Sequence, residues 1–333
     1  MNNTDINEKY KLMNMLTSFW VPQIIYTAVK FSILDIIQEH KSIGLKKLLS
    51  ISGIKYKIGY RLIRALIFLD IVTYDNNEID SSFRKLKLTT MGLLLTAKEI
   101  ESLRDYVILV GEEFYTSWSK LYDIINNKEN FSDKHFYECR NRRDNILLNN
   151  AISSLSQVFF TKLVNFLKLN KADKVLDLGG GDGSFAIKIL EYVNCKIDVL
   201  DRKQLLHSFK KLNNKSNFIR FIGGDFFVKI PKGYDIILLI RVLHNWSDKN
   251  VLKILLNISK QMEKETRLYI VDSIIDNDND FRSLMDINML VLTGGSIRTI
   301  REYTALIRKS NLKFISFKNL DRVYSIIELA RNN

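Results

Sequence analysis

The most constraining feature of this sequence is a run of glycines that directly follows a short apolar segment. Residues 175–178 have the length and composition of a buried strand, and four of the chain's 14 glycines lie between Gly179 and Gly183. Because glycine has no Cβ, the backbone can turn sharply at such a run and a ligand can touch the main chain. The segment therefore predicts a strand that ends in a glycine turn, followed by a helix from Phe185.

The residues around this turn indicate which ligand it binds. A dinucleotide fingerprint reads G-x-G-x-x-G, whereas here the third glycine, Gly183, comes one position early, so a pyrophosphate cradle is the weaker interpretation. Asp201, 22 positions after Gly179, ends a second apolar run, where a carboxylate can accept hydrogen bonds from both ribose hydroxyls. Asp225 and Phe226 follow a third run and offer an acceptor for an amino group beside an aromatic face.

Together these residues predict an adenosine ligand that carries no pyrophosphate. S-adenosylmethionine fits this description, because its cationic sulfonium and amino-acid tail would use Asp177 and backbone carbonyls more than helix-end amides. Two plainer interpretations stay open: the glycines form an ordinary strand-to-helix turn, and Asp201 caps a helix.

The second half of the chain alternates short apolar runs with helical segments. Five runs have the character of buried strands: residues 175–178, 196–200, 218–222, 235–240 and 268–271. Such alternation predicts an α/β fold with a doubly wound, mostly parallel, Rossmann-like sheet. Ligands of such sheets bind beyond the carboxyl ends of the strands, where Gly179, Gly181 and Arg241 are expected beside the residues named above.

The first 170 residues have helical periodicity, with apolar residues three and four apart over residues 19–37 and 60–69. A helix-turn-helix is predicted on residues 45–69, followed by a hairpin over residues 71–80 and 87–89, which is the pattern of a winged helix. We expect three parts: a winged-helix-like domain (1–105), linking helices (106–170) and a ligand-binding domain (171–333).

Composition excludes several classes of protein. With 46% hydrophobic residues the chain can bury a core, which argues against intrinsic disorder. Cys139 and Cys195 are far apart and have no His or second Cys at ligand spacing, so neither a disulfide scaffold nor a zinc site is expected. No signal pattern or apolar segment of spanning length occurs, which predicts a soluble cytoplasmic protein without a membrane partner. The net charge of +13 is spread along the chain, so a solvated basic surface is the main interpretation.

At this level of detail the sequence resembles the S-adenosylmethionine-dependent O-methyltransferases of the caffeate and acetylserotonin type, including bacterial natural-product members. The resemblance covers nearly the whole chain, and its most specific motif is VLHNWSD at residues 242–248. The other matching segments are residues 19–21, 61–66, 88–89, 175–183, 223–226 and 294–299.

The resemblance implies a homodimer formed through the N-terminal domain, S-adenosylmethionine as cofactor and a small-molecule acceptor. It also implies that Asp201 holds the ribose, that Asp225 and Phe226 hold the adenine, and that His244 is the general base. A histidine suits this role because its ordinary pKa lies near neutral pH. The other three histidines, His40, His135 and His207, have no motif around them and are expected at the surface or at helix caps.

Two positions depart from the family pattern beside this histidine. The family orients the base with two acidic residues, and the first matches Asp272, one methylene shorter than the usual glutamate. The second is Ile297, which cannot accept the imidazole proton, and Asn245 stands where the family usually has aspartate. Ile297 is either a tolerated change or a sign that the site performs another reaction on a bound S-adenosyl ligand, such as decarboxylation, hydroxylation or a pericyclic step.

The acceptor pocket is expected to use aromatic and methionine side chains, which suit a flat apolar molecule. The candidates are Trp118, Asn150, Phe159, Asp286 and Met289. Ordinary core packing is the alternative for the apolar members, and Asp286 either faces solvent or meets a polar group of the substrate.

A winged-helix regulator that binds DNA is the competing function from another class. The candidate recognition helix, residues 57–69, is largely apolar, which favours packing against another subunit over reading a DNA groove. We therefore expect no nucleic-acid partner.

Overall fold

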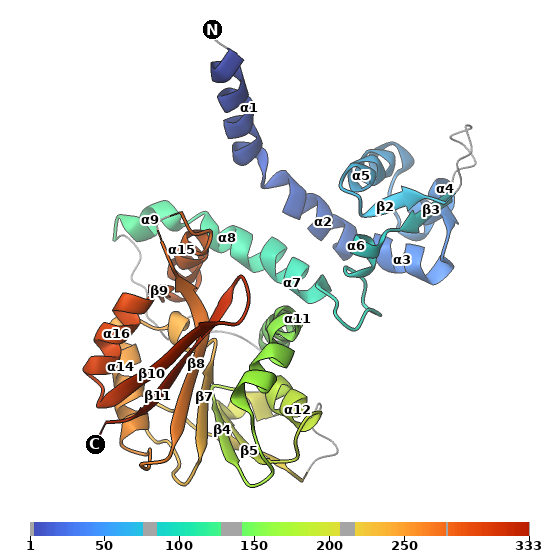
Figure 1. The fold of residues 1–333 in the computed structure, drawn as a ribbon. Coiled ribbons are helices and arrows are strands. Elements are labelled where there is room, and N and C mark those ends of the chain that lie inside the picture. The colour runs from blue at the N-terminus through green and yellow to red at the C-terminus, as the bar shows by residue number, and fades with distance from the viewer. Residues whose placement is uncertain (1–2, 76–84, 128–141, 207–216, 278, 333) are drawn as a thin grey trace. The chain divides into compact units, whose positions relative to one another are not determined.

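The computed structural model describes residues 3–75, 85–127, 142–206, 217–277 and 279–332 (Figure 1). It divides into two compact units, which we describe separately: Met1–Thr116 with Asn150–Leu155, and Ser117–Asn149 with Ser156–Asn333. The three-part division expected from the sequence stays a prediction. His135, His207 and Cys139 lie outside the described residues.

The first unit is mainly helical and carries a small antiparallel sheet. Its strands pair in the order β1-β3-β2. Its elements are α1 (Asn3–Thr17), α2 (Trp20–Lys30), α3 (Ile33–His40), β1 (Ile43–Gly44), α4 (Leu45–Ile51), α5 (Tyr56–Phe68), β2 (Val72–Tyr74), β3 (Lys85–Leu88), α6 (Thr90–Leu93), α7 (Arg104–Leu109) and the π-helical turn Val110–Phe114.

The predicted helix pair and hairpin are present here as α4, α5, β2 and β3, although part of the hairpin lies outside the described residues. Residues 19–37 form two helices rather than one, because Ser32 adopts a left-handed φ of 53° between α2 and α3. Apolar residues from these elements form one core that includes Ala28, Ile33, Leu48 and Ile63. Burial of these apolar side chains accounts for most of the stability of such short helices.

The second unit is built on a large mixed sheet, whose strand order is β10-β11-β8-β7-β4-β5-β6 (Figure 1). The five strands β8, β7, β4, β5 and β6 are parallel to one another. Strand β11 is antiparallel to both of its neighbours, β8 and β10. The strands are β4 (Lys174–Leu178), β5 (Lys196–Asp201), β6 (Ile219–Gly223), β7 (Ile236–Ile240), β8 (Arg267–Ile275), β9 (Arg298–Thr299), which pairs with β8, β10 (Leu312–Asn319) and β11 (Tyr324–Arg331). All five predicted strands are present, whereas the C-terminal hairpin β10–β11 was not predicted.

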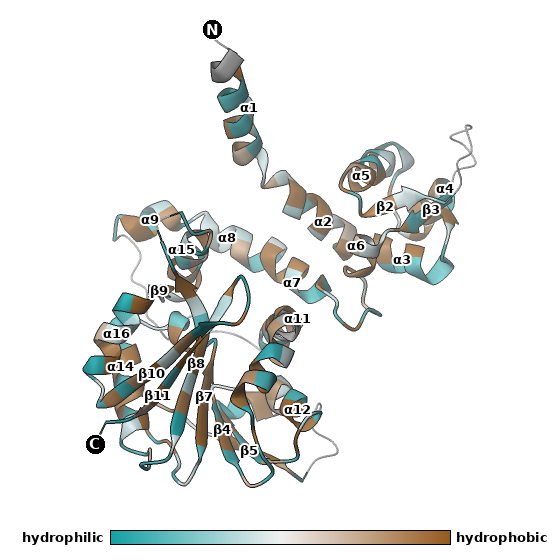
Figure 2. Cartoon of the chain, viewed as in Figure 1, coloured by the Kyte–Doolittle hydropathy of each residue, from teal (hydrophilic) through white to brown (hydrophobic). Residues whose placement is uncertain are grey.

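Helices cover both faces of this sheet. Residues of α14 and α16 pack with Leu176 on one face, and residues of α11 and α12 pack with Val175 on the other. Neighbouring strand residues thus point into opposite cores, which explains why β7 is apolar along its whole length (Figure 2). The remaining helical elements are α8 (Tyr115–Trp118), α9 (Leu121–Ile125), α11 (Arg142–Leu167), α12 (Ser184–Leu190), Lys203–Leu205, Leu243–Asn245, α14 (Asp248–Ser259), α15 (Arg282–Thr293) and α16 (Ile300–Arg308).

The strand order places the expected ligand site. The chain runs outward from β4 to β5 and β6 on one side and returns to β7 and β8 on the other. The order therefore reverses between β4 and β7, and ligands bind in the crevice beyond the carboxyl ends at such a reversal. Within the described residues no single helix is long and apolar enough to cross a membrane; one bent pair, Ile6–Lys30 with Ile33–His40, passes by length and composition alone.

Candidate active site

The glycine turn after β4 has a backbone that only glycine adopts easily. Gly179, Gly181 and Gly183 have φ values of 78°, 62° and 82°, which lie in the region that side chains with a Cβ avoid. A Cβ added to Gly180 would collide with the Asp177 carboxylate, whereas the space beside Gly181 is open. The turn thus packs tightly on its inner side and presents bare backbone on its outer side.

Asp177, near the end of β4, has a buried carboxylate whose lost hydration is not replaced by hydrogen bonds from the described residues. Neither of its oxygens has a hydrogen-bond partner in the structure of the described residues, and the side chain is 1% exposed. Burial, followed by repulsion from Asp201 and Asp182, raises the pKa of Asp177 to about 7. A buried carboxylate of this kind is costly, so the site favours a ligand that brings a cation or hydrogen-bond donors.

Asp201, at the end of β5, is tied to the glycine turn. Its Oδ2 atom accepts a hydrogen bond from the Gly181 amide at 2.8 Å, and its Oδ1 atom accepts one from the Arg202 amide at 2.7 Å. Burial raises the pKa of Asp201, and the two backbone hydrogen bonds partly offset this shift. Each oxygen keeps a second lone pair, so the carboxylate shapes the turn and can still accept hydrogen bonds.

The loop after β6 carries an exposed carboxylate beside an aromatic ring. Asp225 is exposed, Phe226 is half-buried, and the Asp225 Oδ1 atom accepts a hydrogen bond from the Phe227 amide. Asn257 of α14 donates from its amide to the carbonyls of Phe226 and Phe227 at 3.2 and 3.0 Å. The loop is therefore held in place from the helix behind it.

His244 lies in the short helical turn Leu243–Asn245 that follows β7, and it is paired with Asp272 on β8. Its Nδ1 atom hydrogen-bonds Asp272 Oδ1, and its backbone amide donates to Asp272 Oδ2 at 3.1 Å. Among the described residues the Nε2 atom has no hydrogen-bond partner, and the side chain is 10% exposed. An imidazole held in this way donates from Nδ1 and offers Nε2 as an acceptor.

The turn between β7 and His244 has an unusual backbone. Arg241 has a φ of 59°, while its amide still donates to the Val271 carbonyl at 2.8 Å, and its guanidinium lies 5.5 Å from the centre of the Tyr324 ring. The Asn245 amide group donates back to the carbonyls of Arg241 and Val242. A strained residue kept by surrounding contacts is typical of functional loops.

Arg298 holds the same turn in place through hydrogen bonds to its backbone. Its side chain is buried and donates to the carbonyls of Leu243 at 3.1 Å, Trp246 at 2.7 Å and Ser296 at 3.2 Å, and to the Asp248 carboxylate at 2.8 Å. Sequence reasoning placed this arginine in a family motif without a role.

Comparison with known proteins identifies the family. A family model described as an O-methyltransferase domain matches residues 116–312. The chain belongs to the O-methyltransferase family. It is therefore an enzyme, and S-adenosylmethionine is its cofactor.

Relatives match this methyltransferase over most of its length. Phenazine O-methyltransferase PhzM of Lysobacter antibioticus is 25% identical over 311 residues, which cover 90% of this chain and 89% of the relative. Isoflavone-7-O-methyltransferase 6 of Medicago sativa is 29% identical over 330 residues, which cover 91% and 90%. The crystal structure of human N-acetylserotonin methyltransferase in complex with S-adenosylmethionine has the same fold, with a TM-score of 0.89, 21% identity and full coverage of both chains.

The residues of the crevice fit this cofactor. The open backbone beside Gly181 leaves room for a ligand, and the unpaired, buried Asp177 carboxylate suits the positive charge of S-adenosylmethionine. The described residues contain no group of three or more His, Cys, Asp or Glu side chains arranged to hold a metal ion.

Ile297, at the position where the resemblance leads us to expect a second acid, has structural contacts instead. The side chain is 3% exposed, and its amide donates to Asp286 Oδ1 at 2.7 Å. The Ser296 amide donates to the His244 carbonyl at 2.9 Å. A Cβ on Gly295 would collide with that same carbonyl oxygen. The segment therefore touches the backbone of His244 but offers its imidazole no acid from position 297.

The predicted acceptor residues have different environments. Trp118 is partly exposed and donates from Nε1 to Asn288 Oδ1 of α15 at 2.9 Å, and Met289 is half-buried on the same helix. Phe159 is fully buried in the core against Phe160 and Tyr324, as the core-packing alternative expects.

Asp286 and Asn150 are the two polar candidates. Asp286 accepts a hydrogen bond from the Ile297 amide, so one of its oxygens is already engaged. Asn150 belongs to the first unit, where its amide donates to Asp105 Oδ2 at 2.7 Å. Their contact with an acceptor stays a prediction.

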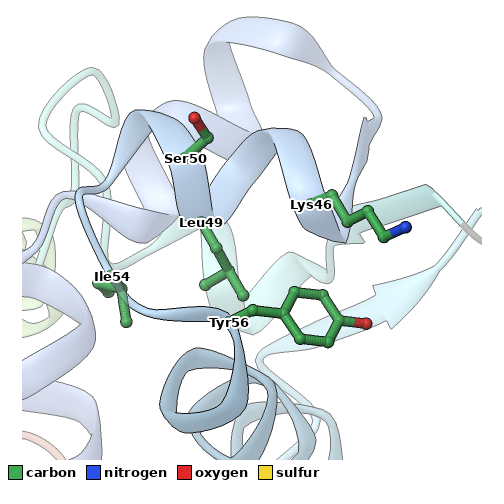
Figure 3. Close-up of a pocket in the computed structure, with 5 residues that line it drawn as sticks. All are labelled: Lys46, Leu49, Ser50, Ile54 and Tyr56. Atoms are coloured by element: carbon green, nitrogen blue, oxygen red, sulfur yellow. The ribbon is translucent and has the colours of Figure 1, made fainter.

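A pocket in the first unit contains none of the predicted site residues. It has a volume of about 360 Å³ and lies between α4 and α5 (Figure 3). Its lining consists of Lys46, Leu49, Ser50, Ile54 and Tyr56.

Proposed function

We propose that this enzyme methylates a hydroxyl group of a small, aromatic, natural-product-like acceptor, with His244 as general base. The observation that carries the proposal is the buried His244–Asp272 pair at the carboxyl edge of the sheet. The names of two relatives, a phenazine and an isoflavone O-methyltransferase, support an aromatic acceptor class.

The protein's own part in the reaction is to position the acceptor and remove its proton. Asp272 binds Nδ1 and so selects the tautomer in which Nε2 is unprotonated. The acceptor O–H bond breaks as Nε2 takes the proton, and the oxygen is left with the electron pair it needs for attack. Bound S-adenosylmethionine supplies an electrophilic methyl group. Positioning the acceptor contributes several kcal/mol in reactions of this kind.

We assign the cofactor contacts as follows. Asp201 would hold the ribose hydroxyls, and Asp225 with Phe226 would hold the adenine. Exposed Asp225 and half-buried Phe226 on a loop fixed by Asn257 support this assignment. Asp177 and the open backbone at Gly181 would serve the methionine part, together with Gly179 and with Arg241, which directly follows the neighbouring strand β7.

For the acceptor we retain Trp118, Asp286 and Met289, which are supported by their place on or against α15. Ile297 keeps a second reaction class open, since the imidazole has one carboxylate instead of two. In that case the enzyme would bind the same cofactor and transform the acceptor by decarboxylation, hydroxylation or a pericyclic step.

We further propose that the first unit is a winged-helix-like dimerisation domain. Exposed apolar side chains on its first two helices support this, because neighbouring exposed apolar residues are typical of a protein–protein contact. They are Leu12, Met13, Met15, Leu16, Trp20 and Val21.

The test is to incubate the enzyme with methyl-labelled S-adenosylmethionine and a panel of phenols, and to measure label in the product by mass spectrometry. We expect label on the acceptor oxygen with wild type and a loss of at least about 100-fold with His244→Ala. Equal methylation by the variant would remove His244 from the mechanism. Conversion of an acceptor without label transfer would favour the second reaction class.

A further inference from the structure

The carboxylate behind His244 has all of its hydrogen-bonding capacity in use. Asp272 Oδ1 accepts from His244 Nδ1 and from the Ser273 amide at 3.0 Å. Asp272 Oδ2 accepts from the His244 amide at 3.1 Å and from the Tyr303 hydroxyl at 2.9 Å. Each oxygen thus receives two donors, which matches the two lone pairs it has available.

Tyr303 is the one side chain besides His244 itself among these donors. It comes from α16, and its side chain is 0% exposed. Burial, followed by the negative charge of Asp272, raises the pKa of Tyr303 well above its ordinary value. The hydroxyl therefore stays protonated, and it is a permanent donor to the carboxylate. Arg298 lies on the ring side of Tyr303, with its guanidinium 5.9 Å from the ring centre.

The Tyr303 hydrogen bond matters more here because the imidazole has a single orienting carboxylate. Ile297 is apolar and buried, so it cannot hold the ring when Asp272 shifts. Without the Tyr303 hydroxyl, Asp272 Oδ2 would keep only a backbone donor, and its unsatisfied lone pair would sit in the core. An unsatisfied buried acceptor raises the free energy of the folded state, so the carboxylate is expected to rotate toward another donor.

We infer that Tyr303 is a positioning residue for His244, which acts by locking the Asp272 carboxylate and thereby the tautomer of the imidazole. The inference rests on the proposed role of His244 as general base. It assigns to α16 a function beyond packing, since the helix holds the carboxylate that selects the reactive nitrogen.

Tyr303→Phe tests this with a minimal change, because it removes one oxygen and keeps the ring. We expect kcat to fall by about tenfold, the size typical of residues that orient a functional histidine from behind. The KM for the acceptor and the affinity for S-adenosylmethionine should stay within about twofold. In nitrogen NMR, the His244 signals, identified by their loss in His244→Ala, should move from a single Nδ1-protonated tautomer toward a mixture.

Tyr234→Phe is the matched control. Tyr234 also donates to a carboxylate, Asp198 Oδ2, at 2.6 Å. It lies just before β7, whereas His244 lies after the other end of that strand. This variant loses the same atom and should keep wild-type kcat.

The outcomes separate the two claims. Wild-type kcat and unchanged His244 signals in Tyr303→Phe, while His244→Ala is inactive, would overturn the role of Tyr303 alone. A lower melting temperature with unchanged kcat would do the same, because it would show a structural role only. Full activity of His244→Ala would instead overturn the proposed function.

Discussion

Among single residues, Asp177 has the most unusual environment. The carboxylate is fully enclosed and lacks hydrogen-bond partners within the described residues, and its pKa is raised to about 7. The folded state therefore binds a proton between about pH 4 and pH 7, where the unfolded chain does not. Stability from this group is present at low pH and is lost as the pH rises toward 7.

Cofactor binding should show the opposite dependence. We expect the affinity for S-adenosylmethionine to rise between pH 6 and pH 8, because the ionised Asp177 carboxylate attracts its positive charge. Titration calorimetry across this range measures the effect. Asp177→Asn should bind about tenfold more weakly at pH 8 and lose the pH dependence. An unchanged pH dependence in the variant would show that another group titrates.

Stability gives an independent reading of the same residue. Ligand-free Asp177→Asn should melt at a higher temperature than wild type at pH 8, because the substitution removes a buried, unpaired charge. The difference should shrink toward pH 5, where wild-type Asp177 is protonated. A variant that melts lower at both pH values would contradict this account.

Among the structural elements, the turn after β7 depends on contacts from the segment that ends at β9. The His244 carbonyl approaches Gly295 so closely that no Cβ fits, and Arg298 binds the carbonyls on both sides of His244. The position of the imidazole is thus determined by residues about 50 positions further along the chain.

Gly295→Ala should therefore reduce activity strongly. The added methyl group must displace the His244 backbone, at a cost of about 1–3 kcal/mol in the free energy of unfolding, and kcat should fall by more than tenfold. Gly44→Ala is the control, since its Cβ would meet nothing within 4 Å. Denaturant unfolding and steady-state kinetics measure both. Wild-type kcat in Gly295→Ala would mean that the turn adjusts freely.

Arg298→Met should destabilise the enzyme by roughly 2–4 kcal/mol, because it removes the buried guanidinium that donates to the carbonyls of Leu243 and Trp246. Arg282→Met is a useful comparison, because Arg282 is also buried and paired, with Asp276 and Asp280, but makes no hydrogen bond to this turn. We expect Arg298→Met to lower kcat, because it disturbs the turn that carries His244. Arg282→Met should leave kcat unchanged. Equal kinetic effects would contradict a specific role.

The glycine turn and the five central strands could be predicted from the sequence, because glycine spacing and short apolar runs are local signals. The hairpin β10–β11 was missed, since β10 mixes lysine and serine with its apolar residues and β11 joins the sheet by pairing with β8, far earlier in the chain. The Tyr303–Asp272 contact was equally invisible, because it joins residues 31 positions apart and no local pattern marks it. Contacts of this kind depend on tertiary packing.

For the chain as a whole, the exposed apolar side chains of α1 and α2 lead to a prediction about assembly. We expect light scattering to give twice the mass of the 38.9 kDa chain. Leu16→Asp with Trp20→Asp, which places charges at residues 66% and 57% exposed, should shift the protein toward the monomer while S-adenosylmethionine still binds. A monomeric wild type would refute the proposed dimer.

The most direct measurement is a crystal structure with bound S-adenosylhomocysteine, the demethylated product. The account predicts its adenosine against Asp201 and Phe226, its amino-acid tail toward Asp177, and its sulfur facing the free Nε2 atom of His244. A ligand bound elsewhere, or an imidazole turned away and shielded from the sulfur, would contradict it.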